Sequence, residues 1–417
     1  MELNESDLIY DWNDVSPAEP SARRRHIELD DETLRDGLQS PSVRTPTIEQ
    51  KLELVHRMVD LGIDGADIGL PAAGPQMFDD VLRITQEIVD QKLPIVPNAA
   101  ARTIISDCEP IVEISQRAGL ALEVAAFIGS SPIRQMAEDW NIDRLLSLTA
   151  SAVEYCTKNG LPVMYVTEDT TRAQPDDLRR LYTCAVEHGA RRVCVADTCG
   201  HATPAGARAA IRFVREVVDA TGETVKVDWH GHRDRGLSIA NALAAIEAGA
   251  SRVHGTALGV GERVGNMPMD QLLVNLVLLG WSDRDLSQLH RYCQLAHEAT
   301  GVPFPDNYPI VGADAFRTAT GVHAAAIIKA RKRGDDWLAD RIYSSIPASL
   351  VGCKQIIEIG PMSGESNIVF WLEAHGYAPD RALVRTIFDV AKRSDVVLSD
   401  DRIHALCRDA ASAPAAV

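Results

Sequence analysis

Short apolar runs alternate with helical patterns along most of the chain. The runs are 27–31, 65–69, 95–100, 122–129, 163–167, 192–197, 225–230 and 252–258. Each is followed by a segment whose apolar residues recur at helical spacing, and this alternation predicts βαβ units with a parallel sheet. Eight even repeats favour a closed (β/α)8 TIM barrel over the alternative, an open doubly wound sheet.

The helical segments also carry terminal signals. The first places apolar residues at 48, 52, 55, 58 and 59, which is one helical stripe. Later segments begin near Pro175 and Pro204. Several segments end on glycine, at Gly62, Gly160, Gly189 and Gly249. Proline in the first turn and glycine after the last are typical helix boundaries.

After Gly280 the alternation stops. Helices are predicted at 286–299, 323–331 and 382–392, and no clear strand pattern is present. We therefore expect an N-terminal arm (1–24), a barrel (25–281), a mainly helical C-terminal subdomain (282–410) and a disordered tail (411–417).

Composition and charge narrow the function classes. Of 417 residues, 46% are hydrophobic and 24% charged, which is typical of a soluble globular protein. A net charge of −17 argues against nucleic-acid or anionic-membrane partners. The eight cysteines form no Cys-x-x-Cys pair, and no signal peptide or membrane span is recognisable. These features predict a cytoplasmic protein with reduced cysteines.

Polar residues gather where the predicted strands end, which is the functional face of a TIM barrel. They are Arg35, Asp36 and Gln39 after the first strand, Glu168 and Asp169 after the fifth, Asp197 and Thr198 after the sixth, and His230 and His232 on the seventh. Each carboxylate alone could simply cap the next helix. Together they predict an active site.

The strongest pattern in this set is His230-Gly231-His232. Residues two apart on a strand point to the same side, so the two imidazoles can share one divalent cation. With Asp36 they form a two-histidine, one-carboxylate set that leaves room for substrate, and Asn266 offers a fourth oxygen. The glycines of the loop 259–266 lack the spacing of a dinucleotide fingerprint, and we expect this loop to approach a ligand or metal.

Three motifs resemble the 2-isopropylmalate synthase and homocitrate synthase family. They are Asp31-Glu32-Thr33-Leu34-Arg35-Asp36-Gly37-Leu38-Gln39, the segment His230-Gly231-His232-Arg233-Asp234, and Gly261-Glu262-Arg263-Val264-Gly265-Asn266. Gly321-Val322-His323 and the segment 360–367 are also similar to the family. The resemblance covers about residues 26–372.

The resemblance implies metal-dependent TIM-barrel enzymes that join acetyl-CoA to a 2-oxo acid. It implies that Asp36, His230, His232 and Asn266 bind the metal, and that Arg35 and Glu168 are catalytic. His323 and Tyr343 match a catalytic pair that is usually offered to the partner's site in a homodimer. Arg35, Gln39 and Thr198 are then expected to contact the substrate.

Some positions depart from the family pattern. The usual acid of the first motif is Leu38, the usual asparagine of the second is Arg233, and a histidine often found on the fourth strand is replaced near Ala125. In the family that these motifs resemble, these positions lie near the site that recognises the 2-oxo acid. The apolar choices favour 2-oxoisovalerate, and homocitrate or citramalate synthesis are the alternatives. The chain is also similar in length to family members without a leucine-sensing domain.

Two other functions are consistent with parts of this pattern. A metal-dependent carbon–carbon lyase on the same barrel would share Arg35, Asp36 and the histidines. The thioester-cleaving lyases carry a cysteine in the glycine loop, and 259–266 has none. A non-enzymatic binding barrel would leave the converging polar set without a purpose. The mixed nitrogen and oxygen ligands permit Zn, Mn, Mg or Co.

Overall fold

The computed structural model describes residues 8–11, 13 and 26–412. It divides into two compact units, a barrel unit (residues up to 285, with 291–303) and a helical unit (286–290, with 304 onwards). Most of the expected arm and most of the expected tail lie outside the described residues. The subdomain boundary at 281/282 stays a prediction.

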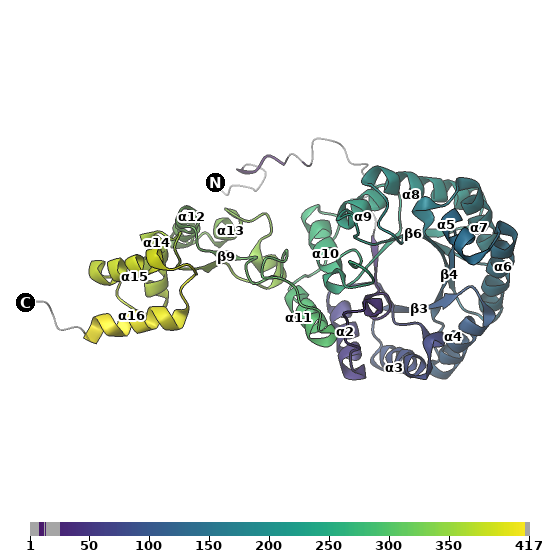
Figure 1. The fold of residues 1–417 in the computed structure, drawn as a ribbon, viewed down its shortest axis with the longest axis horizontal. Helices are drawn as coiled ribbons and strands as arrows, with labels where there is room; N and C mark the ends of the chain where they lie inside the picture. The colour runs from purple at the N-terminus through teal and green to yellow at the C-terminus, as the bar shows by residue number, and fades with distance from the viewer. Residues whose placement is uncertain (1–7, 12, 14–25, 413–417) are drawn as a thin grey trace, which may run out of the picture. The chain divides into compact units, whose positions relative to one another are not determined.

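In the described barrel unit, eight parallel strands close into a ring in chain order, from β1 to β8 and back to β1 (Figure 1). The strands are β1 (Glu28–Asp31), β2 (Gly65–Asp67), β3 (Val96–Arg102), β4 (Glu123–Gly129), β5 (Val163–Glu168), β6 (Arg192–Asp197), β7 (Lys226–Gly231) and β8 (Arg252–Gly255). The TIM barrel followed by a mainly helical region is confirmed, and the open sheet is excluded.

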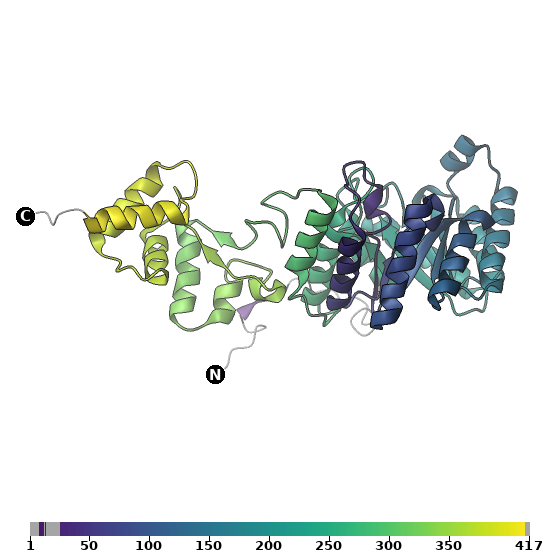
Figure 2. The same ribbon diagram turned by 90° about the horizontal axis from the view of Figure 1, so that it is seen from below.

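Helices surround this ring and run roughly alongside one another in the side view (Figures 1 and 2). They are α2 (Ile48–Asp60), α3 (Pro75–Gln91), α4 (Ile105–Ala118), α5 (Pro132–Glu138), α6 (Ile142–Lys158), α7 (Pro175–Glu187), α8 (Pro204–Asp219), α9 (Ser238–Glu247), α10 (Met269–Leu278) and α11 (Leu289–Thr300).

Local chemistry explains where α2 begins and which face it buries. Thr47 and Gln50 form a reciprocal capping box that satisfies two free backbone N–H groups. Leu54, Val55 and Met58 are fully buried against the barrel, and each contributes about 2 kcal/mol of hydrophobic stabilisation. Lys51 is buried beside them because its ammonium pairs with Asp80 of α3 at 2.5 Å.

The helical unit contains α12 (Gly321–Lys332), α13 (Asp336–Arg341), α14 (Glu365–Ala374), α15 (Arg381–Arg393) and α16 (Asp400–Ser412). Its two strands, β9 (Arg317–Thr318) and β10 (Ile356–Ile357), form one short parallel pair that the sequence pattern did not reveal. Ile368, Leu372 and Ile387 centre its apolar core. Among the described residues, no helix is both long and apolar enough to cross a membrane.

Candidate active site

The carboxyl ends of the barrel strands surround a cavity of about 780 Å³, counting the space open to solvent at its mouth. This size suits a small organic ligand. The lining includes seven of the residues expected from the sequence: Arg35, Asp36, Gln39, Glu168, Thr198, His230 and His232. Residues more than 190 positions apart in the chain therefore share one site because the barrel closes.

Asp36, His230 and His232 meet at one point of this cavity. The Oδ2 atom of Asp36 lies 3.4 Å from Nε2 of His232 and 3.8 Å from Nε2 of His230. Two ligands at about 2.1 Å from a tetrahedral cation lie about 3.4 Å apart, so these separations suit a shared ion. Among the described residues, Asp36 Oδ2 is buried without a hydrogen-bond partner, as a vacant ligand atom would be.

Asn266 reaches the same neighbourhood through its backbone, which forms an antiparallel bridge with His232. Its Oδ1 is buried and has no hydrogen-bond partner in the described part of the chain. Glycines make this placement possible. A Cβ at Gly261 would lie 2.3 Å from Asn266 Nδ2, and one at Gly265 would lie 1.9 Å from the Gly259 carbonyl oxygen. The loop 259–266 therefore folds tightly around the Asn266 amide.

Arg35 is held by three carboxylates. Its Nε donates to Asp67 at 2.6 Å, and its terminal nitrogens lie 3.0 Å from Glu32 and 3.0 Å from Asp36. Burial alone would raise the pKa of Asp36, but Arg35 and the two imidazoles more than offset it, and the pKa of Asp36 lies well below its usual range. Asp36 is therefore charged at neutral pH, as a cation ligand must be.

Glu168 lies at the end of β5, on the rim of the cavity. Burial raises the pKa of Glu168, and Arg134 and Arg35 offset this only in part. A carboxyl group with a raised pKa suits proton transfer near neutral pH. Thr198 also lines the cavity, where its hydroxyl accepts from the Asp169 backbone N–H at 2.9 Å.

His323 and Tyr343 belong to the helical unit, where both are exposed. Their rings stack with centroids 4.0 Å apart and planes inclined by 30°. The structure therefore brings this predicted pair together. Their catalytic role stays a prediction.

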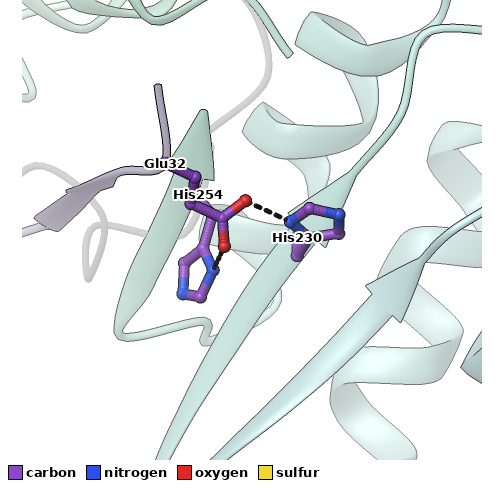
Figure 3. A group of neighbouring side chains, drawn as sticks. All are labelled: Glu32, His230 and His254. Atoms are coloured by element: carbon purple, nitrogen blue, oxygen red, sulfur yellow. Dashed lines mark hydrogen bonds and ion pairs between the residues drawn. The ribbon is translucent and has the colours of Figure 1, made fainter. Parts of the chain in front are cut away.

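Two residues next to His230, Glu32 and His254, were not among the site residues predicted from the sequence. Glu32 Oε2 lies 2.7 Å from His230 Nδ1, and Oε1 lies 2.9 Å from His254 Nδ1 (Figure 3). The sequence pattern that could have indicated Glu32 is the strand alternation. Glu28, Asp30 and Glu32 follow one another at every second position of the first strand, so their side chains point to the same side. That pattern indicates a charged inner face, as do Arg252 and His254 on β8.

The wall opposite these groups is apolar. It consists of side chains from β3 to β6 together with one residue that follows β2: Leu70, Ala100, Ala125, Phe127, Met164, Val166, Cys194 and Ala196. Of the described residues that line the cavity, Arg35 is the only lysine or arginine. The cavity therefore offers a charged side and an apolar side to one ligand.

Comparison with known proteins matches residues 26–296 to the HMGL-like family model. The chain belongs to the HMGL-like family. It is 32% identical to a homocitrate synthase AksA of Methanopyrus kandleri over 91% of each chain, and 33% identical to a probable 2-isopropylmalate synthase of the same organism over 84% of this chain and 66% of that one. The resemblance seen in the motifs is thus confirmed.

Solved structures agree on the fold of this HMGL-like protein. An HMG-CoA lyase from Brucella melitensis matches with a TM-score of 0.55 and 17% identity, over 67% of this chain and 100% of the lyase. At that identity the likeness shows a common barrel and nothing of the reaction.

Proposed function

We propose that this protein is an acyltransferase that condenses acetyl-CoA with a 2-oxo acid, with 2-oxoisovalerate as the preferred substrate and 2-isopropylmalate as the product. The observation that carries the proposal is the convergence of Asp36, His230 and His232 beside Arg35, facing an apolar wall. The relatives named homocitrate and 2-isopropylmalate synthase support the reaction class.

We propose that Asp36, His230, His232 and Asn266 hold a divalent cation. The unpartnered buried oxygens of Asp36 and Asn266 and the imidazole nitrogens close to Asp36 fit such an ion, and the mixed donor set suits Zn, Mn, Mg or Co. The cation, when bound, supplies a Lewis acid for the ketone of the 2-oxo acid. It also explains how a protein with a net charge of −17 accepts an anionic substrate.

The chain's own groups then perform the condensation. Arg35 stabilises the negative charge that develops on oxygen, while Gln39 and Thr198 orient the 2-oxo acid. A base takes a proton from the methyl group of acetyl-CoA, and the resulting carbon attacks the keto carbon. The new C–C bond forms as the C=O π bond opens, and the keto oxygen takes up a proton to become the product's hydroxyl. His323, assisted by Tyr343, is the first candidate for this base, and Glu168 is the second. Water then cleaves the thioester, and CoA leaves as the thiol.

The apolar wall is what favours 2-oxoisovalerate. A second carboxylate, as in 2-oxoglutarate, would face Ala100, Ala125 and Met164 without a cationic partner. Burying such a charge unpaired costs several kcal/mol. An isopropyl group would instead gain about 25 cal/mol for each Å² that it removes from water.

Homocitrate synthesis is the second candidate, because the named relatives support it equally. Relatives of both names match this chain about equally well: the one named homocitrate synthase AksA is 32% identical over 91% of this chain, and the one named probable 2-isopropylmalate synthase is 33% identical over 84%. Citramalate synthesis and carbon–carbon cleavage are further outcomes of the test below.

Release of thiol from acetyl-CoA, followed with a chromogenic reagent, separates these reactions. Purified protein with added Mn²⁺ or Zn²⁺ is offered 2-oxoisovalerate, pyruvate and 2-oxoglutarate. We expect the highest kcat/KM with 2-oxoisovalerate and loss of turnover in chelator. Preference for 2-oxoglutarate would establish homocitrate synthesis instead, and full activity of His232→Ala in chelator would reject the cation.

Complementation tests the proposed homodimer. His323→Ala and His232→Ala should each be inactive alone, because each removes a group that every active site needs. If His323 serves the partner's barrel, mixed dimers contain one site with both histidines and regain part of the activity. No recovery after verified subunit exchange would place His323 in its own subunit's site or outside the reaction.

A further inference from the structure

We propose that Glu32 is a positioning residue for His230, which it holds in one orientation and one tautomer so that Nε2 presents its lone pair to the cation. The inference rests on the proposed cation site and adds a residue to which the family motifs give no role. Glu32 lies just after β1, and its side chain is directed inward between two imidazoles (Figure 3).

Glu32 bridges the two rings with its two oxygens. One contacts Nδ1 of His230 at 2.7 Å, and the other contacts Nδ1 of His254 at 2.9 Å. The second oxygen also forms an ion pair with a terminal nitrogen of Arg35 at 3.0 Å. The carboxylate and its second imidazole partner are buried, since Glu32 is 2% exposed and His254 is 1% exposed. A buried carboxylate with three charge-assisted contacts has little freedom to rotate.

His254 fixes Glu32 from below because both of its ring nitrogens face carboxylates. Its Nε2 lies 3.2 Å from Asp228 Oδ2, while its Nδ1 faces Glu32. Ionised carboxylates only accept hydrogen bonds, so both nitrogens donate and the ring is an imidazolium. Burial alone would lower the pKa of His254, but Glu32 and Asp228 raise it to about 10.

Asp228 is anchored in turn by two arginines. Arg192 donates to its Oδ1 at 2.7 Å, and Arg252 donates to its Oδ2 at 2.8 Å. A continuous chain of ion pairs thus runs from the barrel interior to Glu32. It keeps Glu32 ionised and in place, so Glu32 is a fixed acceptor.

The consequence for His230 follows from this fixed acceptor. With this carboxylate 2.7 Å away, the tautomer of His230 that carries its proton on Nδ1 is favoured, and its Nε2 is then unprotonated in the neutral ring. That Nε2 is the atom 3.8 Å from Asp36 Oδ2. A carboxylate on the far nitrogen of a metal-binding histidine fixes its tautomer and raises its basicity, and losing it usually weakens metal binding 10- to 100-fold.

His232 lacks such support. Its Nδ1 is buried without a hydrogen-bond partner in the described part of the chain, although its Nε2 lies 3.4 Å from Asp36 Oδ2. The two histidines are therefore unequal, since only His230 has its tautomer set by a carboxylate.

A second cation between Glu32, His230 and His254 would be another interpretation, because their ligand atoms lie within 4.8 Å of one another. The contacts of 2.7 and 2.9 Å are hydrogen-bond lengths and are shorter than the ~3.4 Å between ligands of a tetrahedral ion. An imidazolium also has no free lone pair. This cluster is therefore a set of close polar contacts that supports the cation site.

The test measures cation affinity in the absence of substrate. Chelator-stripped protein is titrated with Zn²⁺ against a competing indicator, and the visible spectrum of the Co²⁺ form reports the ligand geometry. For Glu32→Gln we expect Kd to rise about 10- to 100-fold with an altered Co²⁺ spectrum, because the amide cannot accept from both rings. Asp80→Asn is the matched control, since it also removes a buried ion pair but lies outside the cavity lining, and its Kd should not change.

A Kd for folded Glu32→Gln within twofold of the parent would overturn the proposal. If that variant does not fold, Glu32→Asp keeps the charge but withdraws the oxygens by about 1.5 Å and should give the same weakening. Histidine ¹⁵N spectra of the unaltered, metal-free protein decide the matter without any variant at position 32. We expect His230 protonated on Nδ1, and a proton on Nε2 alone would overturn the proposal. If no 2-oxo acid supports thiol release but these results hold, the proposed reaction fails and the positioning role stands.

Discussion

The two halves of the barrel mouth differ sharply in chemistry. Strands β7, β8, β1 and β2 and the residues just after them supply Glu32, Arg35, Asp36, Asp67 and three histidines. Strands β3 to β6 supply mostly alanine, aliphatic, sulfur-containing and phenyl side chains at the same level. The charged half can hold a cation and an anionic headgroup, while the apolar half suits an uncharged substituent.

The residues of each half come from separate blocks of the sequence. Apart from Glu168, the charged and histidine side chains of the lining come from the two ends of the barrel segment, 32–67 and 230–262. Apart from Leu70, the apolar ones come from its middle, 100–196. Ring closure through β1 and β8 places the two charged blocks side by side. A feature that looks like scattered polar residues in the sequence is therefore one continuous surface in the fold.

The largest effect on activity should follow from replacing Asp36, the carboxylate at the centre of the charged half. Asp36→Asn removes an anionic ligand and leaves Arg35 with one partner fewer. We expect kcat/KM to fall at least about a thousandfold, or ~4 kcal/mol of transition-state stabilisation, with Zn²⁺ affinity reduced in parallel. A variant that keeps its turnover and its Zn²⁺ affinity would show that the cation does not bind there.

The second effect is on the stability of the protein, because burying several carboxylates in one place costs free energy of folding. Asp31 is fully buried at the end of β1, next to the charged half, and burial raises its pKa to about 6 against hydrogen bonds from Thr33 and Tyr292. Because the pKa of Asp31 is higher in the folded than in the unfolded protein, protonated Asp31 contributes to the free energy of unfolding. This contribution is fully present below pH ~4 and is lost as the pH rises through about 6.

The Asp31→Asn variant should therefore match the parent near pH 4 and exceed its free energy of unfolding by about 3 kcal/mol at pH 7.5. Asparagine can still accept from the Thr33 N–H, so the contact itself is kept. Urea unfolding across this pH range is the measurement. A difference between variant and parent that stays constant with pH would contradict the prediction.

Glu168 tests whether the rim of the apolar half contributes a proton-transfer group. Glu168→Gln removes the titrating group while preserving size, and we expect kcat to fall by at least about a hundredfold with little change in KM for the 2-oxo acid. Burial raises the pKa of Glu168, so this base becomes protonated at a higher pH than an ordinary carboxyl group. As the pH is lowered, the parent's kcat should therefore begin to fall at a correspondingly higher pH. An unchanged kcat would leave His323 as the only candidate base.

The smallest expected effect is on substrate preference, and it tests whether the apolar half contacts the substituent of the 2-oxo acid. Ala125→Leu adds three carbons beside Ala100 and Met164 and narrows the space for an isopropyl group. The ratio of kcat/KM for 2-oxoisovalerate to that for pyruvate should fall about 10- to 100-fold, with pyruvate serving as the internal control. Equal losses on both substrates would mean that this wall does not contact the substituent.

Much of this could be predicted because strand periodicity and strand ends are local properties. All eight strands form where short apolar runs indicated them, and seven of the expected site residues line one cavity. Glu32 and His254 escaped notice because their importance lies in a contact between residues 222 positions apart. Strands β9 and β10 escaped notice because two residues are too few to show an alternating pattern.

A crystal structure with Zn²⁺ and 2-oxoisovalerate would test the division of the barrel mouth most directly. We predict one anomalous peak about 2.1 Å from Asp36 Oδ2 and from Nε2 of both His230 and His232, with the isopropyl group against Ala100, Ala125 and Met164. Zinc bound elsewhere, or a substrate whose isopropyl group faces Arg35 and Glu32, would contradict it.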